Sequence, residues 1–327
     1  MLFAGFVIQL SLGKYKYFRS LFSFLQESLS IAIGSRFICV LIVPEKLCRC
    51  RWVRRELIYK AVSIILNDFE MIIKKFPKND DIIILPISDV HLGALEHMTR
   101  EWEMFVSKVL DRPNIYLTLG GDLLDNATKA SIASPWDNTM RPAEQKKVMA
   151  AMLEPIKDRI LCIIPGNHCG RNRDVDDDPM YDIACKLDIE DIYRPNMAFV
   201  KIQIGTQNGD GTRNPTYMLC VAHGAGSSIY VGGAATKGER FGMAVDGIDC
   251  LITGHTHKPA DLPNAKIYVD KFNNKISIKP WRHLVCSSWL GYASYAARKL
   301  LPPTAYAEQT LILHGKEKAI EITQVTR

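Results

Sequence analysis

Carboxylate, imidazole and amide side chains recur in this sequence directly after short apolar runs that have the length of buried strands. Five of the chain's eight histidines lie in these segments. The candidate residues are, in chain order, Asp89, His91, Asp122, Asp125, Asn167, His168, His223, His255 and His257. Hard and borderline divalent cations bind carboxylate, imidazole and amide oxygen ligands, so the set has the chemistry of a metal centre.

Each segment by itself has a simpler structural interpretation. Asp89-Val90-His91 and Gly121-Asp122 are ordinary turns at strand ends, and Asn167-His168 fits a turn with a hydrogen-bonded imidazole. Gly254-His255-Thr256-His257 either binds zinc or caps a strand. The four segments and His223 occur together, each after an apolar run, and this joint pattern favours a metal centre with two divalent cations.

The apolar runs predict the strands that position these residues. They are Ile82–Ile87, Ile115–Leu119, Ile160–Ile164, Met218–Ala222 and Cys250–Thr253. The first three alternate with two amphipathic helical patterns, one around Trp102 and one over Pro142–Ile156, and the β-α-β-α-β order favours an α/β layered fold. Ligands in open α/β sheets collect beyond the carboxyl ends of the strands, so we expect the candidate side chains to meet there.

The second half of the chain is richer in predicted strands. Ala198–Ile204 and Thr216–Ala222 flank a polar turn and predict a hairpin. Further antiparallel strands are expected over 266–269, 275–278, 309–313 and 319–323. Residues 224–247 contain seven glycines together with Lys237 and Arg240, and this composition predicts a long loop that faces the substrate.

Composition excludes several classes of protein. The chain has 327 residues, 47% of them hydrophobic, which is enough to bury a large core. The net charge is +6, but residues 1–60 hold ten Lys or Arg and three Glu, so the remainder carries a charge of −1. That nearly neutral body argues against a broad DNA-binding face. Nine cysteines, several in apolar runs, indicate buried free thiols in a reducing compartment, so we expect a cytoplasmic protein.

Three regions are expected. Residues 1–50 form a basic apolar extension, residues 51–80 an amphipathic helix, and residues 81–327 the domain that carries the motifs. The helix is predicted over Trp52–Phe76, with Pro77 ending it. Three interpretations of the extension stay open: a poorly ordered or non-native segment, a membrane-surface segment over residues 1–55, or a membrane anchor. Cytoplasmic location with peripheral membrane association is therefore the alternative expectation.

The order Asp-x-His, Gly-Asp-x-x-Asp, Gly-Asn-His, a lone His and Gly-His-x-His resembles the signature of the calcineurin-like metallophosphoesterase superfamily. The motifs span Asp89–His257. The resemblance implies an α/β fold of two packed mixed β-sheets flanked by helices, a four-layer sandwich, here with an N-terminal helical extension. It also implies a phosphoesterase in which metal-bound hydroxide attacks phosphorus.

The same resemblance implies a role for each candidate residue. One metal ion would be held by Asp89, His91 and His257. The other would be held by Asn167, His223 and His255, with Asp122 bridging the two ions. His168 resembles the family's catalytic histidine, and Asp125 matches the carboxylate that orients its imidazole. The cofactors implied are two divalent ions, with Mn²⁺ favoured and Fe, Zn, Ni or Mg as alternatives.

Departures from the family pattern narrow the substrate class. Asn126-Ala127 follows Gly-Asp-x-x-Asp where the Ser/Thr protein phosphatases have Arg-Gly, and the segment looks more like superfamily phosphodiesterases and nucleases. Cys169 stands where many members carry a carboxylate, and a buried inert thiol is favoured over a redox-sensitive one. Arg171 and Arg173 are expected either to contact a phosphate or to lie in a solvated loop.

We therefore expect a metal-dependent phosphoesterase with a phosphodiester or nuclease-type substrate. A phosphomonoesterase and a membrane-surface hydrolase of phospholipids or lipid precursors are the alternatives, and a non-catalytic scaffold on the same fold has less support because every ligand position is filled. The expected partners are the phosphate-ester substrate, nucleic acid as one form of it, and a membrane surface through residues 1–55. The sequence does not specify an oligomeric state.

Overall fold

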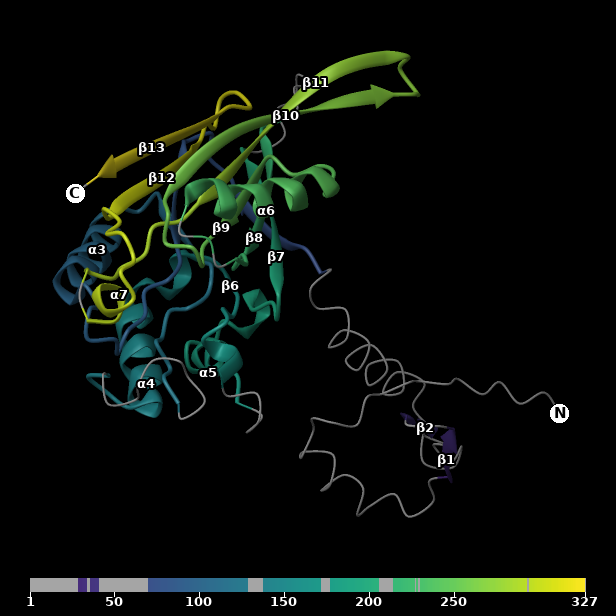
Figure 1. Cartoon of the computed structure of the whole chain (residues 1–327). Coiled ribbons are helices and arrows are strands. Elements are labelled where there is room, and N and C mark those ends of the chain that lie inside the picture. The colour runs from purple at the N-terminus through teal and green to yellow at the C-terminus, as the bar shows by residue number, and fades with distance from the viewer. Residues whose placement is uncertain are drawn as a thin grey trace. The chain divides into compact units, whose positions relative to one another are not determined.

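Figure 1 shows the computed structural model of the chain. The structure describes residues 29–33, 36–40, 70–128, 138–171, 177–205, 214–226, 228, 230–292 and 294–326. The chain divides into two units, Met1–Leu66 and Asn67–Arg327. In the first unit, strands β1 (Leu29–Ile33) and β2 (Arg36–Val40) pair antiparallel. The other residues of the predicted extension, and the predicted helix as far as residue 69, lie outside the described residues.

One sheet of the second unit has five strands in the order β13-β12-β4-β5-β6. They are β4 (Ile82–Ile87), β5 (Ile115–Leu119), β6 (Ile160–Ile163), β12 (Ala307–Leu313) and β13 (Ile320–Thr326). Strands β4, β5 and β6 run parallel, whereas β12 pairs antiparallel with both β4 and β13. The parallel strands are the apolar runs of the sequence, and such runs form strands whose two faces are both covered.

The other sheet has six strands in the order β10-β11-β9-β8-β7-β3. They are β3 (Ile72–Phe76), β7 (Met197–Ile204), β8 (Thr216–Ala222), β9 (Cys250–Thr253), β10 (Ala260–Asp270) and β11 (Lys275–Val285). Strands β7 and β8 form the predicted hairpin, and β8, β9 and β11 run parallel. Strands β10 and β11 pair antiparallel as predicted. Each has 11 residues and is much longer than the predicted strands over 266–269 and 275–278.

The two sheets share one core, to which Leu85 and Leu117 contribute from the first sheet and Val200 and Leu219 from the second. Helices flank the sheets (Figure 1). They are α3 (Thr99–Asp111), α4 (Pro142–Leu153), α5 (Pro179–Lys186), α6 (Val231–Ala244) and α7 (Ser294–Arg298), with 3-10 turns over Glu154–Arg159 and Glu190–Ile192. The predicted fold class, two packed mixed sheets flanked by helices, is confirmed.

The predicted helix over Trp52–Phe76 is wrong at its C-terminal end. Residues 72–76 form β3, which pairs parallel with β7 in the register Ile72↔Val200 to Phe76↔Ile204. Ile72 is buried, Ile73 is exposed and Phe76 is half-buried, so burial follows the two-residue period of a strand. The edge of β7 offers backbone partners that the apolar periodicity alone does not reveal. The predicted domain boundary at residue 81 therefore leaves out one strand of the sheet.

The predicted loop over residues 224–247 is also wrong, because most of it forms helix α6. Gly238 and Gly242 lie one helical turn apart on the side that packs against β11. A Cβ on Gly238 would lie 2.1 Å from Cε1 of His283, and one on Gly242 would lie 2.3 Å from Cη2 of Trp281. These glycines therefore allow a helix to approach a sheet closely and do not mark a loop.

Most of the cysteines that the structure describes are buried free thiols. Within the described residues the thiols are free, and five of them are buried: Cys162, Cys169, Cys220, Cys250 and Cys286. Burial raises the pKa of Cys169, as expected for an inert thiol. No helix in the described part of the chain is long and apolar enough to cross a membrane.

Candidate metal centre

All nine candidate residues follow the carboxyl ends of five strands and lie in one place. The loops after β4, β5 and β6 come from one sheet, and those after β8 and β9 come from the other. Five of the nine residues have φ angles between 50° and 71°: Asp89, His91, Asp122, His255 and His257. Non-glycine residues seldom adopt this left-handed conformation, and such strain is typical of functional sites.

Asp89, His91 and His257 form the first of two ligand sets. Oδ1 of Asp89 lies 3.3 Å from Nε2 of His257 and 3.8 Å from Nε2 of His91. The two imidazole nitrogens lie 3.2 Å apart. Asp89 and His91 are buried, whereas His257 is half-buried. Three ligand atoms therefore face one another, as expected of residues that share one cation.

Asp122, Asn167, His223 and His255 form the second set. Nε2 of His223 lies 3.1 Å from Oδ2 of Asp122 and 2.9 Å from Oδ1 of Asn167. Oδ1 of Asn167 also lies 2.6 Å from Nδ1 of His255. The two sets touch, because the backbone N–H of His255 donates to Oδ2 of Asp89 at 2.8 Å. The contacts group Asp122 with this second set, and its bridging role stays a prediction.

Backbone carbonyl groups fix the orientation of the imidazoles. Nδ1 of His223 lies 2.9 Å from the carbonyl oxygen of Gly120, and Nε2 of His255 lies 2.7 Å from that of Gly226. A nitrogen that faces a carbonyl oxygen carries a proton, so in the neutral imidazoles the lone pair lies on Nε2 of His223 and on Nδ1 of His255, where a cation would bind. These are the nitrogens that face Asn167. Such outer contacts are typical of histidine ligands to metals.

Two glycines leave room for the carboxylates. A Cβ on Gly166 would lie 2.2 Å from Oδ1 of Asp122, and a Cβ on Gly254 would lie 2.4 Å from Oδ2 of Asp89. Each glycine precedes a candidate ligand, Asn167 or His255, so the close approach of backbone and carboxylate places the two ligand sets side by side.

His168 lies beside both sets and is held by Asp125 and Arg171. Nδ1 of His168 lies 2.7 Å from the backbone oxygen of Asp125 and 3.3 Å from Oδ1 of the same residue. Nη2 of Arg171 lies 2.9 Å from Nε2 of His168. A guanidinium group only donates, so Nε2 accepts and the proton of the neutral imidazole lies on Nδ1. Nη1 of Arg171 also donates to the backbone oxygen of Asp125 at 2.6 Å.

The pKa shifts show how much negative charge the centre holds. Burial raises the pKa of Asp89, but His257 and His91 outweigh burial and hold that pKa well below its usual range. The pKa values of Asp122 and Asp125 are lowered in the same way by neighbouring histidines. Burial lowers the pKa of His91, but Asp125 and Asp89 outweigh burial and raise it to about 10. Burial also lowers the pKa of His223, and Asp122 is the main group that raises it to about 9.

His168 behaves differently from His91 and His223. Burial and the neighbouring His91 lower the pKa of His168, so this imidazole is neutral at pH 7. The three carboxylates of the centre, those of Asp89, Asp122 and Asp125, are buried and ionised, and buried negative charge needs positive charge nearby.

The residues present fit divalent cations. Oδ1 of Asp89 is buried and meets no hydrogen-bond partner among the described residues, so a ligand atom faces the centre without a partner. The donor set is carboxylate, imidazole and amide oxygen, which suits Mn²⁺, Fe²⁺ and Zn²⁺. A third group, His91 with Asp125 and His168, also lies close enough to share an ion. The two ligand sets described above therefore offer ligands for two cations.

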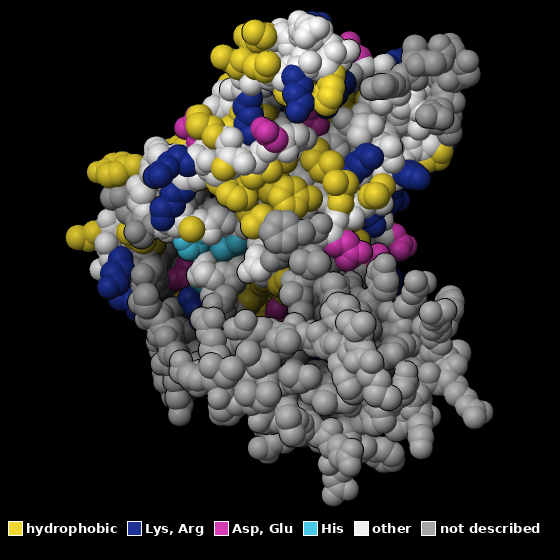
Figure 2. Space-filling model, turned by 90° about the vertical axis from the view of Figure 1, so that its right-hand side faces the viewer, with side chains coloured by type: hydrophobic (Ala, Val, Ile, Leu, Met, Phe, Trp, Pro, Cys, Tyr) yellow, Lys and Arg dark blue, Asp and Glu magenta, His cyan; other side chains and the backbone are white. Residues whose placement is uncertain are grey.

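The centre is open on the side of Asn167. This residue is exposed, and His168, His255 and His257 are half-buried, whereas the carboxylates are buried. Figure 2 shows histidine side chains at the surface with Lys and Arg side chains nearby. A phosphate ester would reach the ligands from this side.

Sequence reasoning missed Gln145, and it did not foresee that Asn126 connects Gln145 to His168. Gln145 is fully buried in helix α4, and its Oε1 accepts a hydrogen bond of 2.9 Å from the backbone N–H of Asn126. Asn126 in turn donates from Nδ2 to the backbone oxygen of His168 at 2.9 Å. The only signal in the sequence for the role of Gln145 was its position as a polar residue on the buried face of a helix. Arg171 was a candidate for phosphate contact, and its contact with His168 was not foreseen; Arg173 lies outside the described residues.

Comparison with known proteins gives a family match and a set of similar solved structures. Residues 82–259, which are 178 of the 327 residues, match the family described as calcineurin-like phosphoesterase. Vps29 from Chaetomium thermophilum is 13% identical, with a TM-score of 0.33, over 75% of this chain and 97% of that one. The NAD nucleotidase NadN from Haemophilus influenzae is 10% identical, also with a TM-score of 0.33, over 76% of this chain and 50% of that one. No curated protein matches the sequence.

Proposed function

The chain belongs to the calcineurin-like phosphoesterase family, and from this premise we propose that it hydrolyses phosphate diesters with two divalent cations at the candidate metal centre. The observation that carries the proposal is the meeting of two ligand sets, with His168 and Arg171 beside them. Two bound cations would lower the pKa of a water molecule and neutralise charge on the phosphate. The ions proposed are Mn²⁺ first, with Fe, Zn, Ni or Mg as alternatives.

The residues of the chain have separate tasks in this proposal. Asp89, His91 and His257 would hold one cation, and Asn167, His223 and His255 would hold the other, with Asp122 as a ligand that both could share. His168 keeps its proton on Nδ1 and accepts from Arg171 at Nε2, which holds the guanidinium group beside the open side of the centre. From there Arg171 stabilises negative charge on a phosphate or leaving-group oxygen by donating hydrogen bonds.

Asn126 supports a diester rather than a monoester. A family member with an arginine after Gly-Asp-x-x-Asp has an additional positive charge at this point, whereas Asn126 is neutral and its Nδ2 is bound to the backbone oxygen of His168. A diester carries one negative charge and a monoester carries up to two, so the less positive site suits the diester. The nearly neutral body of the chain further favours a small diester, or a nucleic-acid end, over an extended nucleic acid.

Hydrolysis of bis-p-nitrophenyl phosphate and of p-nitrophenyl phosphate, each with added Mn²⁺, tests the proposal. We expect faster turnover of the diester by the wild type. His168→Ala should lower kcat by about 10²- to 10³-fold while metal content stays the same. Faster turnover of the monoester would favour a phosphomonoesterase. Bound metal without hydrolysis of either ester would favour the scaffold alternative.

A further inference from the structure

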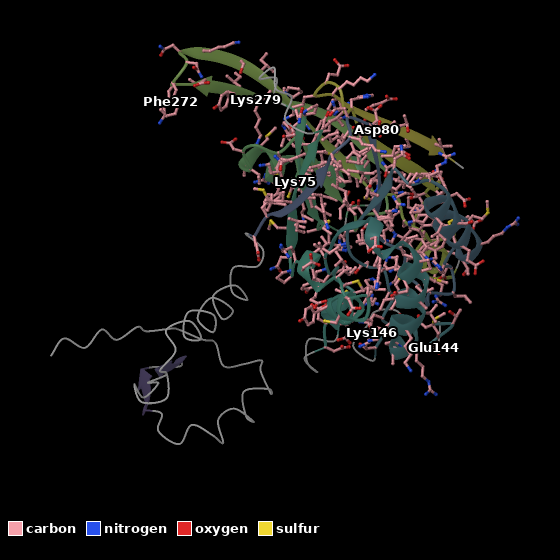
Figure 3. The ribbon with its side chains drawn as sticks, turned by 180° about the vertical axis from the view of Figure 1, so that it is seen from behind. Lys75, Asp80, Glu144, Lys146, Phe272 and Lys279 are labelled. Carbon is pink, nitrogen blue, oxygen red and sulfur yellow. The ribbon has the colours of Figure 1, made fainter. Side chains whose placement is uncertain are left out.

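A long hairpin arm formed by residues 266–279 extends from the six-stranded sheet. It contains the outer parts of β10 and β11 and the turn between them, and its tip lies away from the body of the protein (Figure 1). Figure 3 shows Phe272 at the tip and Lys279 nearer the body. The two strands pair in register to the turn, from Lys266↔Lys279 to Asp270↔Lys275.

One face of the arm is apolar and exposed. Ile267 lies opposite Ile278, and Val269 lies opposite Ile276, so four aliphatic side chains share one face. Their exposed fractions are 76%, 73%, 64% and 70%, and Phe272 in the turn is 86% exposed. Single exposed apolar residues are common on soluble proteins, whereas a continuous apolar stripe marks a contact surface.

The other face and the turn of the arm are basic. The arm contains four lysines and one aspartate, which gives a net charge of +3. Lys275 and Lys279 lie on the face opposite the aliphatic stripe, and Nζ of Lys279 lies 3.1 Å from the centre of the Tyr268 ring. Lys271 lies in the turn, and Lys266 at the base faces Asp246 of the body at 3.7 Å.

Asp270, the single carboxylate of the arm, accepts hydrogen bonds from the residues of the turn. Oδ1 of Asp270 accepts hydrogen bonds from the backbone N–H groups of Phe272 and Asn273, at 3.0 and 3.1 Å, and Oδ2 accepts from Nδ2 of Asn273. These bonds hold the tip in a defined conformation with Phe272 outward. Asp270 is the only carboxylate of the arm and offsets one of the four lysine charges, so the arm keeps its net charge of +3.

Charge and hydrophobicity together select one occupant for this surface. A second copy would bring two lysine clusters of equal charge together, and strand addition at β10 is hindered by Pro263 and Lys266 on this edge strand. A nucleic acid would attract the lysines but has no contact for the stripe of isoleucine and valine. A bilayer with anionic lipid offers both hydrocarbon and phosphate. We propose that the arm docks on the surface of an anionic phospholipid bilayer.

The arm has the layout of an amphipathic segment that lies in the plane of a membrane. The aliphatic stripe and Phe272 enter the boundary of the acyl chains to a depth of about 5–10 Å, and the lysines on the opposite face stay at the level of the lipid headgroups. The arm is a different part of the sequence from residues 1–55, the segment for which the sequence predicts membrane contact. The inference does not depend on the proposed hydrolase activity.

Sedimentation of the full chain with phosphatidylcholine vesicles, with and without phosphatidylserine, tests the inference. We expect binding that requires phosphatidylserine and weakens with salt. The apolar triple variant Phe272→Ser, Ile276→Ser, Ile278→Ser should lower the partition coefficient at least about tenfold. The basic triple variant Lys271→Ala, Lys275→Ala, Lys279→Ala should lower it on the order of a hundredfold. The matched control, Leu95→Ser, Met104→Ser, Leu300→Ser, removes exposed apolar side chains outside the arm and should bind as the wild type does.

A probe at the tip separates the arm from residues 1–55. We expect brominated phosphatidylcholine in the vesicles to quench the fluorescence of Phe272→Trp more strongly than that of the wild type, and to leave Leu300→Trp at the wild-type level. Circular dichroism would confirm that each variant is folded. Absence of sedimentation, equal binding by the apolar variant, or no added quenching at residue 272 would overturn the inference. A dimer that the apolar variant dissociates, or oligonucleotide binding in place of vesicle binding, would also overturn it.

Discussion

The backbone N–H of His168 donates a hydrogen bond of 2.8 Å to Oδ1 of Asp122. A carboxylate of the metal centre is thus joined directly to the residue proposed to act beside the ester. Because Oδ2 of the same carboxylate lies 3.1 Å from Nε2 of His223, Asp122 links His168 to the second ligand set. A change at Asp122 should therefore affect both metal binding and the position of His168. A change at His168 should leave metal binding unaffected.

Asp122→Asn tests this link. The variant removes a negative charge from the buried centre, so we expect loss of bound metal and a fall in kcat of more than about 100-fold. Substitutions of residues that only contact a ligand typically lower activity by about 10- to 100-fold. Metal analysis and diester hydrolysis measure the two effects. Asp111→Asn, an exposed carboxylate at the end of α3, is the control and should change neither. A variant that loses activity but keeps both metal ions would contradict a ligand role for Asp122.

Arg171→Ala should lower activity without loss of metal. Arg171 contacts Nε2 of His168 and the backbone oxygen of Asp125, so its removal frees the imidazole, and we expect kcat to fall about 10- to 100-fold. Arg171→Lys should restore only part of the activity, because a single ammonium group cannot reproduce both contacts of the planar guanidinium. Kinetics at saturating diester, with metal analysis, measure this. Full activity of Arg171→Ala would show that the contact has no role in turnover.

Gly238→Ala should destabilise the fold, although alanine is the better helix former. A Cβ at residue 238 would lie 2.1 Å from the ring of His283, and overpacking of this kind costs about 1–3 kcal/mol, against a gain of up to about 1 kcal/mol in helix propensity. Gly232→Ala in the same helix is the matched control, because a Cβ there meets no atom within 4 Å. Urea unfolding should show a lower free energy of unfolding for Gly238→Ala and an unchanged or higher one for Gly232→Ala. The same sign for both would contradict the packing.

His283 should make the stability of the fold depend on pH. Burial lowers the pKa of this imidazole to about 4, and Nε2 lies 2.9 Å from Oγ1 of Thr253. The unfolded chain binds a proton at this residue below about pH 6.5, and the folded chain binds it only below about pH 4. Stability is therefore retained above pH 6.5 and lost as the pH falls between these values, by about 2 kcal/mol from pH 7 to pH 5.

The measurement is the free energy of unfolding in urea at pH 7 and pH 5 for the wild type and for His283→Gln, which cannot titrate. The other histidines contribute equally to both proteins, so the difference between the two pH dependences reports residue 283. Equal pH dependences would mean that the folded protein protonates His283 as readily as the unfolded chain does.

The sequence alone determined the polar residues of the candidate centre and the strands that carry them. A run such as Ile82–Ile87 or Ile160–Ile163 is apolar throughout, which is typical of a buried strand, and the residues after it lie at the strand's end. Parallel strands place their carboxyl ends on the same edge of a sheet, which brings together the candidate residues of each sheet, and the packing of the two sheets then joins the two groups. These relationships depend on local composition and chain direction, which a sequence states directly.

Only the tertiary structure decided how segments distant in the chain contact one another. Residues 72–76 form a strand that pairs with the edge of β7, and residues 231–244 form a helix in which Gly238 packs closely against His283 of β11. The contact of Arg171 with His168, and the register that aligns Ile267 with Ile278 on the arm, follow equally from geometry in three dimensions. Contacts of this kind depend on shape and distance between separate elements, and these arise only when the whole domain has packed.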